Sequence, residues 1–348
     1  MSDAIARLPK SELHVHLEGT ISPATLWRLA ESNQVALPAG SLAELERMYD
    51  FKSFDHFIEL WLAMCSCLRR PEDFEQMVDG YLAECGRHNI QYAELHFTPY
   101  NHELTGFGGR RALDIVTRRF EASERSGGPV ARLIVDIPSE SEEVSAPYTL
   151  ELLEQEANPL IVALGLGGPE EGFPRRRFAK WFERARRAGY PVVAHAGETG
   201  GADHVRQAVL ELGVRRIQHG VRAAEDPDVL RLLAERSICC DVAVTSNIRL
   251  KVYPDLSAHP LRTLMDAGVP VTLSTDDPPF FGTNLTREWE IARDQLGLSM
   301  GELWQLNLNG LRYGLAETGV RRRLFRAFAE AALREGISGA GGAGNGAR

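Results

Sequence analysis

The chain has 348 residues, of which 44% are hydrophobic and 25% charged, and its formal net charge is -9. These values are typical of a globular protein, and the length allows two average domains or one large α/β barrel. The negative charge, with no basic stripe broken by aromatic residues, argues against nucleic acid as the main partner.

The ends of the chain and its cysteines indicate where the protein acts. No signal-like segment opens the sequence and no apolar run approaches the ~18 residues of a bilayer span, so we expect no membrane association and a cytoplasmic location. The five cysteines lack C-x-x-C spacing and are expected to be reduced. Residues 1–337 are predicted to form one domain, and the Gly/Ala-rich residues 338–348 a disordered tail.

Short apolar runs rich in β-branched residues, each followed by a polar or glycine-rich turn, predict eight buried parallel strands. They are Glu12–His16, Tyr92–Thr98, Ala131–Ile137, Ile161–Gly165, Pro191–His195, Arg215–His219, Ile238–Val244 and Pro270–Ser274. Amphipathic patterns between them predict helices, including Phe178–Ala188, Ala202–Leu212, Asp226–Ala234 and Pro260–Ala267. This alternation predicts an α/β fold, a (β/α)8 TIM-type barrel with extra helices inserted after strand one.

The insertion occupies residues 17–91, between the first two predicted strands. Within it, large apolar residues recur at helical spacing: Phe51, Phe54, Phe57, Leu60, Trp61 and Met64. Such a segment is either a helix packed on the barrel or an apolar lid over the active site, and one helix could be both.

Candidate metal ligands fall at the ends of predicted strands. His14 and His16 end strand one, His195 ends strand five, and Asp276 follows strand eight. Active sites of such barrels are built at the C-terminal ends of the strands, and residues two apart on a strand point the same way. Three imidazoles and a carboxylate suit zinc, although iron, manganese or cobalt would also fit.

Three further residues could serve hydrolysis. A divalent cation lowers the pKa of bound water from about 16 to about 7. His219, which ends strand six, and Asp277 are placed to hydrogen-bond that water, and Glu198 is placed to donate a proton. His96 is a candidate for the rim, whereas the other histidines are expected to be structural or solvated: His56, His88, His102, His204 and His259.

These motifs resemble the adenosine deaminase branch of the metal-dependent amidohydrolases. The matching segments are residues 8–20, 195–198, 216–220 and 274–278. The resemblance implies one zinc held by the four ligands, and a small-molecule 6-aminopurine as substrate. The H-x-E and P-C-x-x-C signature of cytidine-type zinc deaminases is absent.

The resemblance also implies roles for the remaining site residues. Glu198 would protonate purine N1, and His219 would orient or deprotonate the water and stabilise the developing alkoxide. Asp277 would contact the water and N7, and the Gly168 amide would contact N3. The products would be a 6-oxopurine and ammonia.

Departures from the family pattern leave the substrate open. Asp241-Val242-Ala243-Val244 replaces the usual Glu-Val-Cys-Pro, which puts support of the site in question. Glu18 stands where several nucleoside deaminases have an aspartate that contacts the ribose, so Glu18 is a candidate substrate-binding residue with altered sugar recognition.

Other segments resemble particular branches of the family. Residues 165–170 and 135–138 are similar to aminodeoxyfutalosine deaminases, whereas residues 18–20 and 219–226 are similar to adenine deaminases. The sequence ranks adenosine or a related nucleoside first, aminodeoxyfutalosine second and adenine third. A non-catalytic binder and a hydrolase of a lactone, amide or phosphoester are the alternatives of another class. The sequence indicates no oligomeric state.

Overall fold

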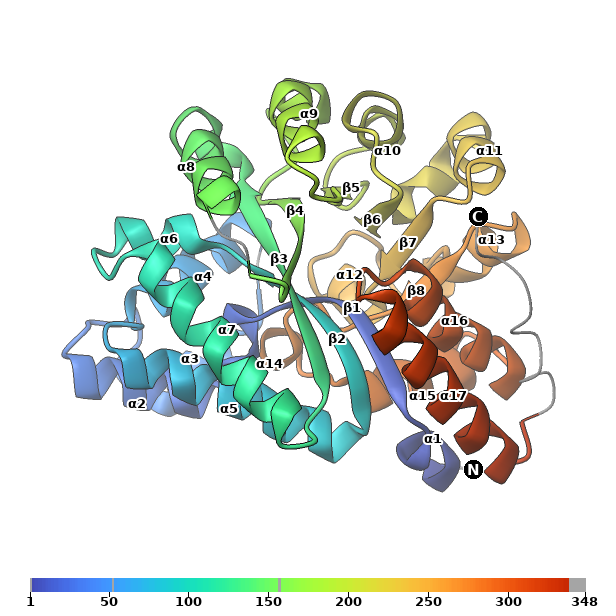
Figure 1. Ribbon diagram of the computed structural model, residues 1–348, viewed down its shortest axis with the longest axis horizontal. Coiled ribbons are helices and arrows are strands. Elements are labelled where there is room, and N and C mark those ends of the chain that lie inside the picture. The colour runs from blue at the N-terminus through green and yellow to red at the C-terminus, as the bar shows by residue number, and fades with distance from the viewer. Residues whose placement is uncertain (1, 52, 156–157, 338–348) are drawn as a thin grey trace.

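The computed structural model describes residues 2–51, 53–155 and 158–337, so the predicted tail lies outside the described residues. Parallel strands alternate with helices that surround them (Figure 1). The strands are β1 Lys10–His16, β2 Ile90–Phe97, β3 Val130–Pro138, β4 Ile161–Gly167, β5 Ala194–Ala196, β6 Arg216–His219, β7 Cys239–Val242 and β8 Val271–Leu273.

Strand pairing follows the order of the chain, as in a TIM barrel. β1 to β4 form one four-stranded parallel sheet and β5 to β8 another. Single parallel bridges join Leu164 to Val192 and Val15 to Asp276, so pairing continues across both seams between the sheets. The predicted α/β barrel is therefore confirmed.

The predicted insertion after strand one is confirmed as well. It contains α2 Pro23–Asn33, α3 Leu42–Met48, α4 Phe54–Ser66 and α5 Pro71–His88. Serine side chains cap the first turns of three of these helices: Ser22 accepts from Thr25 N, Ser41 from Glu44 N, and Ser53 from His56 N. The caps fix where α2, α3 and α4 begin.

The remaining long helices surround the barrel. They are α7 Gly109–Arg125, α8 Glu142–Gln155, α9 Ala179–Arg187, α11 Pro227–Glu235, α15 Leu285–Asp294, α16 Met300–Tyr313 and α17 Thr318–Arg334. The shorter ones are α1 Ser2–Arg7, α6 Pro99–Leu104, α10 Ala202–Gln207, α12 Val244–Arg249, α13 Leu261–Asp266 and α14 Pro278–Phe281. The predicted helix over 202–212 is α10 followed by a π-helical turn at Ala208–Leu212.

Most predicted strand boundaries differ from the observed ones by one to three residues, and two of these differences have a clear physical reason. Val244 begins α12 rather than ending β7, because its β-branched side chain is compatible with either element. β5 begins at Ala194 rather than Pro191, since proline has no N–H for the ladder and only its carbonyl bonds, to Leu164 N at 3.0 Å.

A buried ion-pair network crosses the barrel interior. Arg216 on β6 contacts Glu94 Oε2 on β2 at 2.5 Å and Asp241 Oδ2 on β7 at 2.9 Å. All three side chains are buried. Such a network is weak support for stability, but removal of either carboxylate would leave Arg216 less well compensated.

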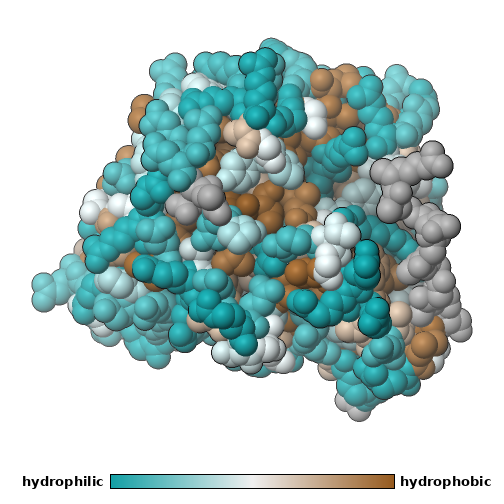
Figure 2. All heavy atoms as spheres, in the orientation of Figure 1, coloured by the Kyte–Doolittle hydropathy of each residue, from teal (hydrophilic) through white to brown (hydrophobic). Residues whose placement is uncertain are grey.

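Polar and charged residues cover most of the face in Figure 2, and hydrophobic residues show mainly in its middle. In the part of the chain that the structure describes, we find no helix with the length and apolar character required to cross a bilayer.

Candidate active site

The backbone holds Asp276 beside the first two histidines. His16 N donates to Asp276 O at 2.9 Å, and Asp276 N donates to His14 O at 3.0 Å. Asp276 adopts a left-handed conformation with φ of 64°, and His219 does the same with φ of 62°. Such conformations in non-glycine residues cost roughly 1–3 kcal/mol each and are typical of functional sites.

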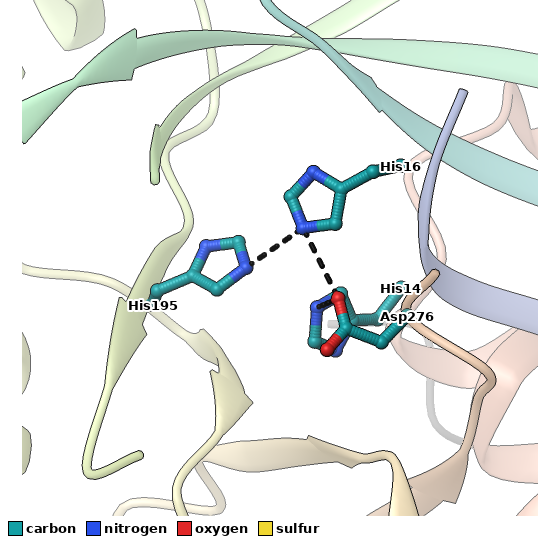
Figure 3. A group of neighbouring side chains, drawn as sticks. All are labelled: His14, His16, His195 and Asp276. Carbon is teal, nitrogen blue, oxygen red and sulfur yellow. Dashed lines mark hydrogen bonds and ion pairs between the residues drawn. The ribbon is translucent and has the colours of Figure 1, made fainter. Parts of the chain in front are cut away.

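Four predicted ligands converge on one point (Figure 3). Each offers a donor atom, and these atoms all lie within 4.8 Å of one another. The Nε2 atoms of His14 and His16 are each 3.3 Å from Asp276 Oδ1. His16 Nε2 is 3.1 Å from His195 Nε2. The structure thus brings together side chains from β1, β5 and the segment after β8.

Hydrogen bonds at the far side of two rings leave their Nε2 lone pairs available. His14 Nδ1 donates to Asp241 O at 3.1 Å, and His195 Nδ1 donates to Leu166 O at 2.8 Å. His14 Nε2 is buried with no hydrogen-bond partner among the described residues. Neutral imidazoles with this tautomer are the form that binds metals, so the set fits a divalent cation.

The departure at position 241 does not reach this site through its side chain. His14 bonds the main-chain carbonyl of Asp241, which any residue would supply. The Asp276 carboxylate is oriented by Ser246, whose Oγ donates to Oδ2 at 2.7 Å. The question that the sequence leaves open at position 241 is therefore answered for the His14 contact, which a main-chain carbonyl supplies.

A chain of hydrogen bonds assigns the tautomer of His219. Leu261 N donates to His259 Nδ1 at 3.2 Å, so His259 Nε2 carries the proton and donates to Asn247 Oδ1 at 3.1 Å. The Asn247 amide then donates to His219 Nδ1 at 3.1 Å. Neutral His219 therefore carries its proton on Nε2.

That Nε2 atom faces the candidate metal ligands. It lies 3.5 Å from Glu198 Oε1 and 3.8 Å from Asp276 Oδ2. Burial lowers the pKa of His219 to about 3, so the ring is neutral near pH 7. His219 thus presents a hydrogen-bond donor to the site.

Glu198 is held in place through its own backbone. Glu170 Oε1 accepts from Glu198 N at 2.8 Å and Thr199 N at 3.1 Å, while Oε2 accepts from Gly197 N at 2.8 Å. Burial and the charge of Asp276 raise the pKa of Glu198 well above its ordinary value. A carboxyl that keeps its proton near neutral pH is suited to act as an acid.

Asp277 fits against a residue that has no side chain. A Cβ on Gly19 would lie 1.7 Å from Asp277 Oδ1 and 2.9 Å from the Trp61 ring. Asp277 is buried, and burial together with the charge of Asp276 raises its pKa well above the ordinary value. Glycine at 19 is required by this close approach.

The cluster lies at the bottom of a cavity of about 660 Å³, counting its mouth. Helix α4 contributes one apolar wall, from Phe54, Phe57, Ile58, Trp61 and Leu62. Phe57 and Trp61 are also buried in the main core. The predicted packing of this helix on the barrel is therefore confirmed, and α4 also lines the cavity, whereas its action as a lid stays a prediction.

Gly168 and Glu140 also line the cavity. Gly168, with φ of 82°, lines the cavity next to Glu140, and a Cβ on Gly168 would lie 2.5 Å from Glu140 Oε2. Glu140 is exposed to solvent at the cavity wall.

Glu18 is not among the cavity-lining residues. Its Oε1 accepts from Thr98 N at 3.2 Å and lies 3.1 Å from His102 Nε2, and the residue is fully buried. Thr98 itself lines the cavity, so Glu18 lies behind the wall. A direct contact of Glu18 with substrate stays a prediction.

Sequence reasoning missed several supporting residues. They include Glu170, which the sequence indicates only as part of the segment 165–170, and Asn247. His96, the predicted rim candidate, packs 5.1 Å from the His16 ring, measured between centroids, and its Nδ1 lies 3.0 Å from both Asp136 oxygens. The signal that could have revealed Glu170 is its place just beyond the end of β4, at the same rim as His195.

Comparison with known proteins agrees with this geometry. The adenosine deaminase family model matches residues 9–331. An adenine deaminase of Bordetella parapertussis is 37% identical over 319 residues, covering 91% of this chain and 99% of the relative. An aminodeoxyfutalosine deaminase of Streptomyces coelicolor is 37% identical over 322 residues, covering 92% of this chain and 83% of the relative.

Two solved structures have the same fold. An adenine deaminase from Arthrobacter aurescens has a TM-score of 0.89 and 31% identity, covering 94% of this chain and 99% of that one. A cog1816 amidohydrolase from Burkhoderia ambifaria, with bound Zn, has a TM-score of 0.89 and 26% identity. The match covers 96% of this chain and 93% of that one.

Fold and site together define an amidohydrolase of the TIM-barrel type with a candidate centre for a divalent metal. The chain belongs to the adenosine deaminase family. It is a hydrolytic deaminase that acts on C–N bonds, and its relatives support an aminopurine as substrate.

Proposed function

We propose that this protein deaminates a neutral 6-aminopurine to the 6-oxopurine and ammonia, with one zinc ion per chain held by His14, His16, His195 and Asp276. The observation that carries the proposal is the convergence of these donor atoms within 4.8 Å. The three-nitrogen, one-oxygen set suits zinc, and the relative with bound Zn supports that choice. When bound, such a cation supplies an activated water.

Two residues of the chain itself donate a proton to the purine and orient the water. Protonated Glu198 donates to purine N1, which makes C6 more electrophilic. His219, with its proton on Nε2, orients the water and stabilises the charge that develops on the oxygen at C6. The tautomer favours this role over proton abstraction.

Two residues position the base. Asp277 contacts the water and purine N7, and the Gly168 amide contacts N3. The left-handed backbone and absent side chain of Gly168 support such a close approach by a flat ligand.

The charge of the cavity supports an uncharged substrate. No lysine or arginine is found among the described residues that line it, so no cationic side chain there would pair with an anionic substrate. Adenosine is the first candidate, and adenine is the second, which the adenine deaminase relatives favour. Aminodeoxyfutalosine carries a carboxylate, which Glu140 would repel at the mouth.

A substrate panel tests this assignment. We expect kcat/KM for adenosine or adenine to exceed that for AMP and aminodeoxyfutalosine by about 100-fold, measured by absorbance change and ammonia release. Glu140→Lys is expected to raise kcat/KM for the anionic compounds about tenfold, because it replaces a repulsive charge with an attractive one.

Glu143→Lys is the matched control for that change, since Glu143 is exposed nearby on α8 and does not line the cavity. This control variant is expected to leave the ratio of kcat/KM for neutral and anionic compounds unaltered. If aminodeoxyfutalosine were the best substrate of the unmodified enzyme, the neutral-substrate proposal would be wrong.

A substitution at Gly19 tests the role of Asp277 without touching a metal ligand. Gly19→Ala forces Asp277 to move, and we expect kcat/KM to fall about 100-fold with unchanged zinc content. Zinc is measured by atomic absorption and turnover at steady state. Gly80→Ala is the control, because nothing lies within 4 Å of its Cβ. Activity of the Gly19 variant within about threefold of the control would contradict the role of Asp277.

The proposed enzyme has a single domain and acts in the cytoplasm. We infer that residues 1–337 act as one domain, since Ser11 N on β1 donates to Asn307 Oδ1 on α16 at 2.8 Å, which ties the two ends together. We place the reaction in the cytoplasm, where the five buried, unpaired cysteines would stay reduced.

A further inference from the structure

A second cavity lies at the other end of the barrel. It is lined by residues 191–193, which precede β5, by Arg215 and Arg216 at the start of β6, and by Arg236 and Ser237, which precede β7. Residues 312–316, at the end of α16 and just beyond it, close another side. The cavity, about 1350 Å³ with its mouth, therefore lies at the N-terminal ends of the strands. The candidate metal ligands lie at the opposite, C-terminal ends.

The walls of this cavity are strongly basic. Six arginines line it: Arg186, Arg215, Arg216, Arg236, Arg312 and Arg321. No aspartate or glutamate occurs among the lining residues within the described ranges. In a chain with a net charge of -9, such a concentration of one sign is local and not a property of the whole surface.

Most of these guanidinium groups have no acidic partner. Arg215 and Arg236 are exposed, and no hydrogen bond or ion pair holds either of them among the residues that the structure describes. Arg312 Nη1 lies 3.1 Å from Asn309 Oδ1, and Arg321 Nη1 donates to Arg312 O at 3.3 Å. Arg186 bonds the carbonyl of Leu212. These contacts are all with neutral groups, so none offsets the charge.

Arg216 forms the inner wall. Its pairing with Glu94 and Asp241 compensates its own charge but leaves the other five arginines uncompensated. Arg216 is 3% exposed, and its Nη2 has no hydrogen-bond partner among the described side chains and backbone. Arg321 Nε is likewise buried without one. Both are donors that a bound anion could satisfy after a small side-chain movement.

We propose that this cavity binds a small molecule carrying phosphate groups. Guanidinium groups match phosphate oxygens in paired hydrogen bonds, and several of them favour a multiply charged phosphate compound over a single carboxylate. A hollow of this size fits a small molecule and not a nucleic-acid backbone, which would need a continuous basic stripe. The site is separate from the deaminase cavity and does not depend on the proposed function.

Calorimetric titration of the full-length, zinc-loaded protein with fructose 1,6-bisphosphate tests the site. This probe has two phosphates and no purine, so it does not resemble the deaminase substrate. At constant ionic strength we expect saturable binding that the double variant Arg215→Ala/Arg236→Ala weakens by at least about tenfold. Uncharged fructose is expected not to bind.

The matched control removes two exposed arginines elsewhere. Arg28→Ala on α2 with Arg47→Ala on α3 changes net charge equally, and binding is expected to stay within about twofold. Arg236→Ala alone is a second variant if the double variant does not fold. Absence of saturable binding, equal weakening in both double variants, or binding that persists without Arg215 and Arg236 would each overturn the proposal.

Discussion

Replacing Glu198 with glutamine is expected to lower kcat by at least about 100-fold while the protein keeps its full complement of zinc. Glutamine preserves the size of the side chain and the Glu170 contacts to the backbone, but it has no acidic proton to give to purine N1. Steady-state turnover and metal analysis of the same preparation measure the two effects.

The control for this variant is Glu171→Gln, a carboxamide change at an exposed residue next to Glu170. It is expected to leave turnover within about twofold of the unmodified enzyme. Near-normal turnover of the Glu198 variant would refute the proton-donor role, whereas loss of zinc would show that Glu198 contributes to metal binding instead.

Removal of one metal ligand is expected to have the largest effect. His195→Ala should reduce bound zinc well below one ion per chain and lower activity by about 10,000-fold or more, because the water then loses its activation. Treatment of the unmodified enzyme with a chelator should abolish activity, and added zinc should restore it. Added zinc should not restore the variant.

His88→Ala serves as the histidine control. His88 lies at the end of α5, bonded to Thr286 Oγ1 at 2.9 Å and far along the chain from every proposed ligand. We expect the His88 variant to keep full activity and one zinc ion per chain. If the His195 variant retained both zinc and turnover, His195 would not be a zinc ligand.

The fold was predictable because its signal is periodic and local. Eight apolar runs alternate with amphipathic ones, and each run corresponds to a strand. The ends of the strands were less predictable, as at Val244, because burial and β-branching continue past the last ladder hydrogen bond. The positions of the insertion helices depend on tertiary packing, and the sequence indicated only one of the four by residue.

The candidate site was predictable where specific side chains are needed and unpredictable where the backbone acts. His14, His16, His195 and Asp276 are identifiable because few residue types bind a cation. The groups that orient His14 and His195 are backbone carbonyls, such as Leu166 O, which carry no signal in the sequence. The placement of Glu18 depends on an amide and a histidine from distant segments, so its orientation could not be read from its neighbours.

Asp241 makes two independent contacts, one through its backbone and one through its side chain. Its peptide carbonyl faces His14, and its side chain faces Arg216 on the path to the basic cavity. Evolution could therefore exchange the side chain to suit the charge at the N-terminal end without altering the metal ligand. A mismatch with the Glu-Val-Cys-Pro pattern at this position therefore does not by itself argue against the reaction, because the contact to His14 needs only the peptide carbonyl.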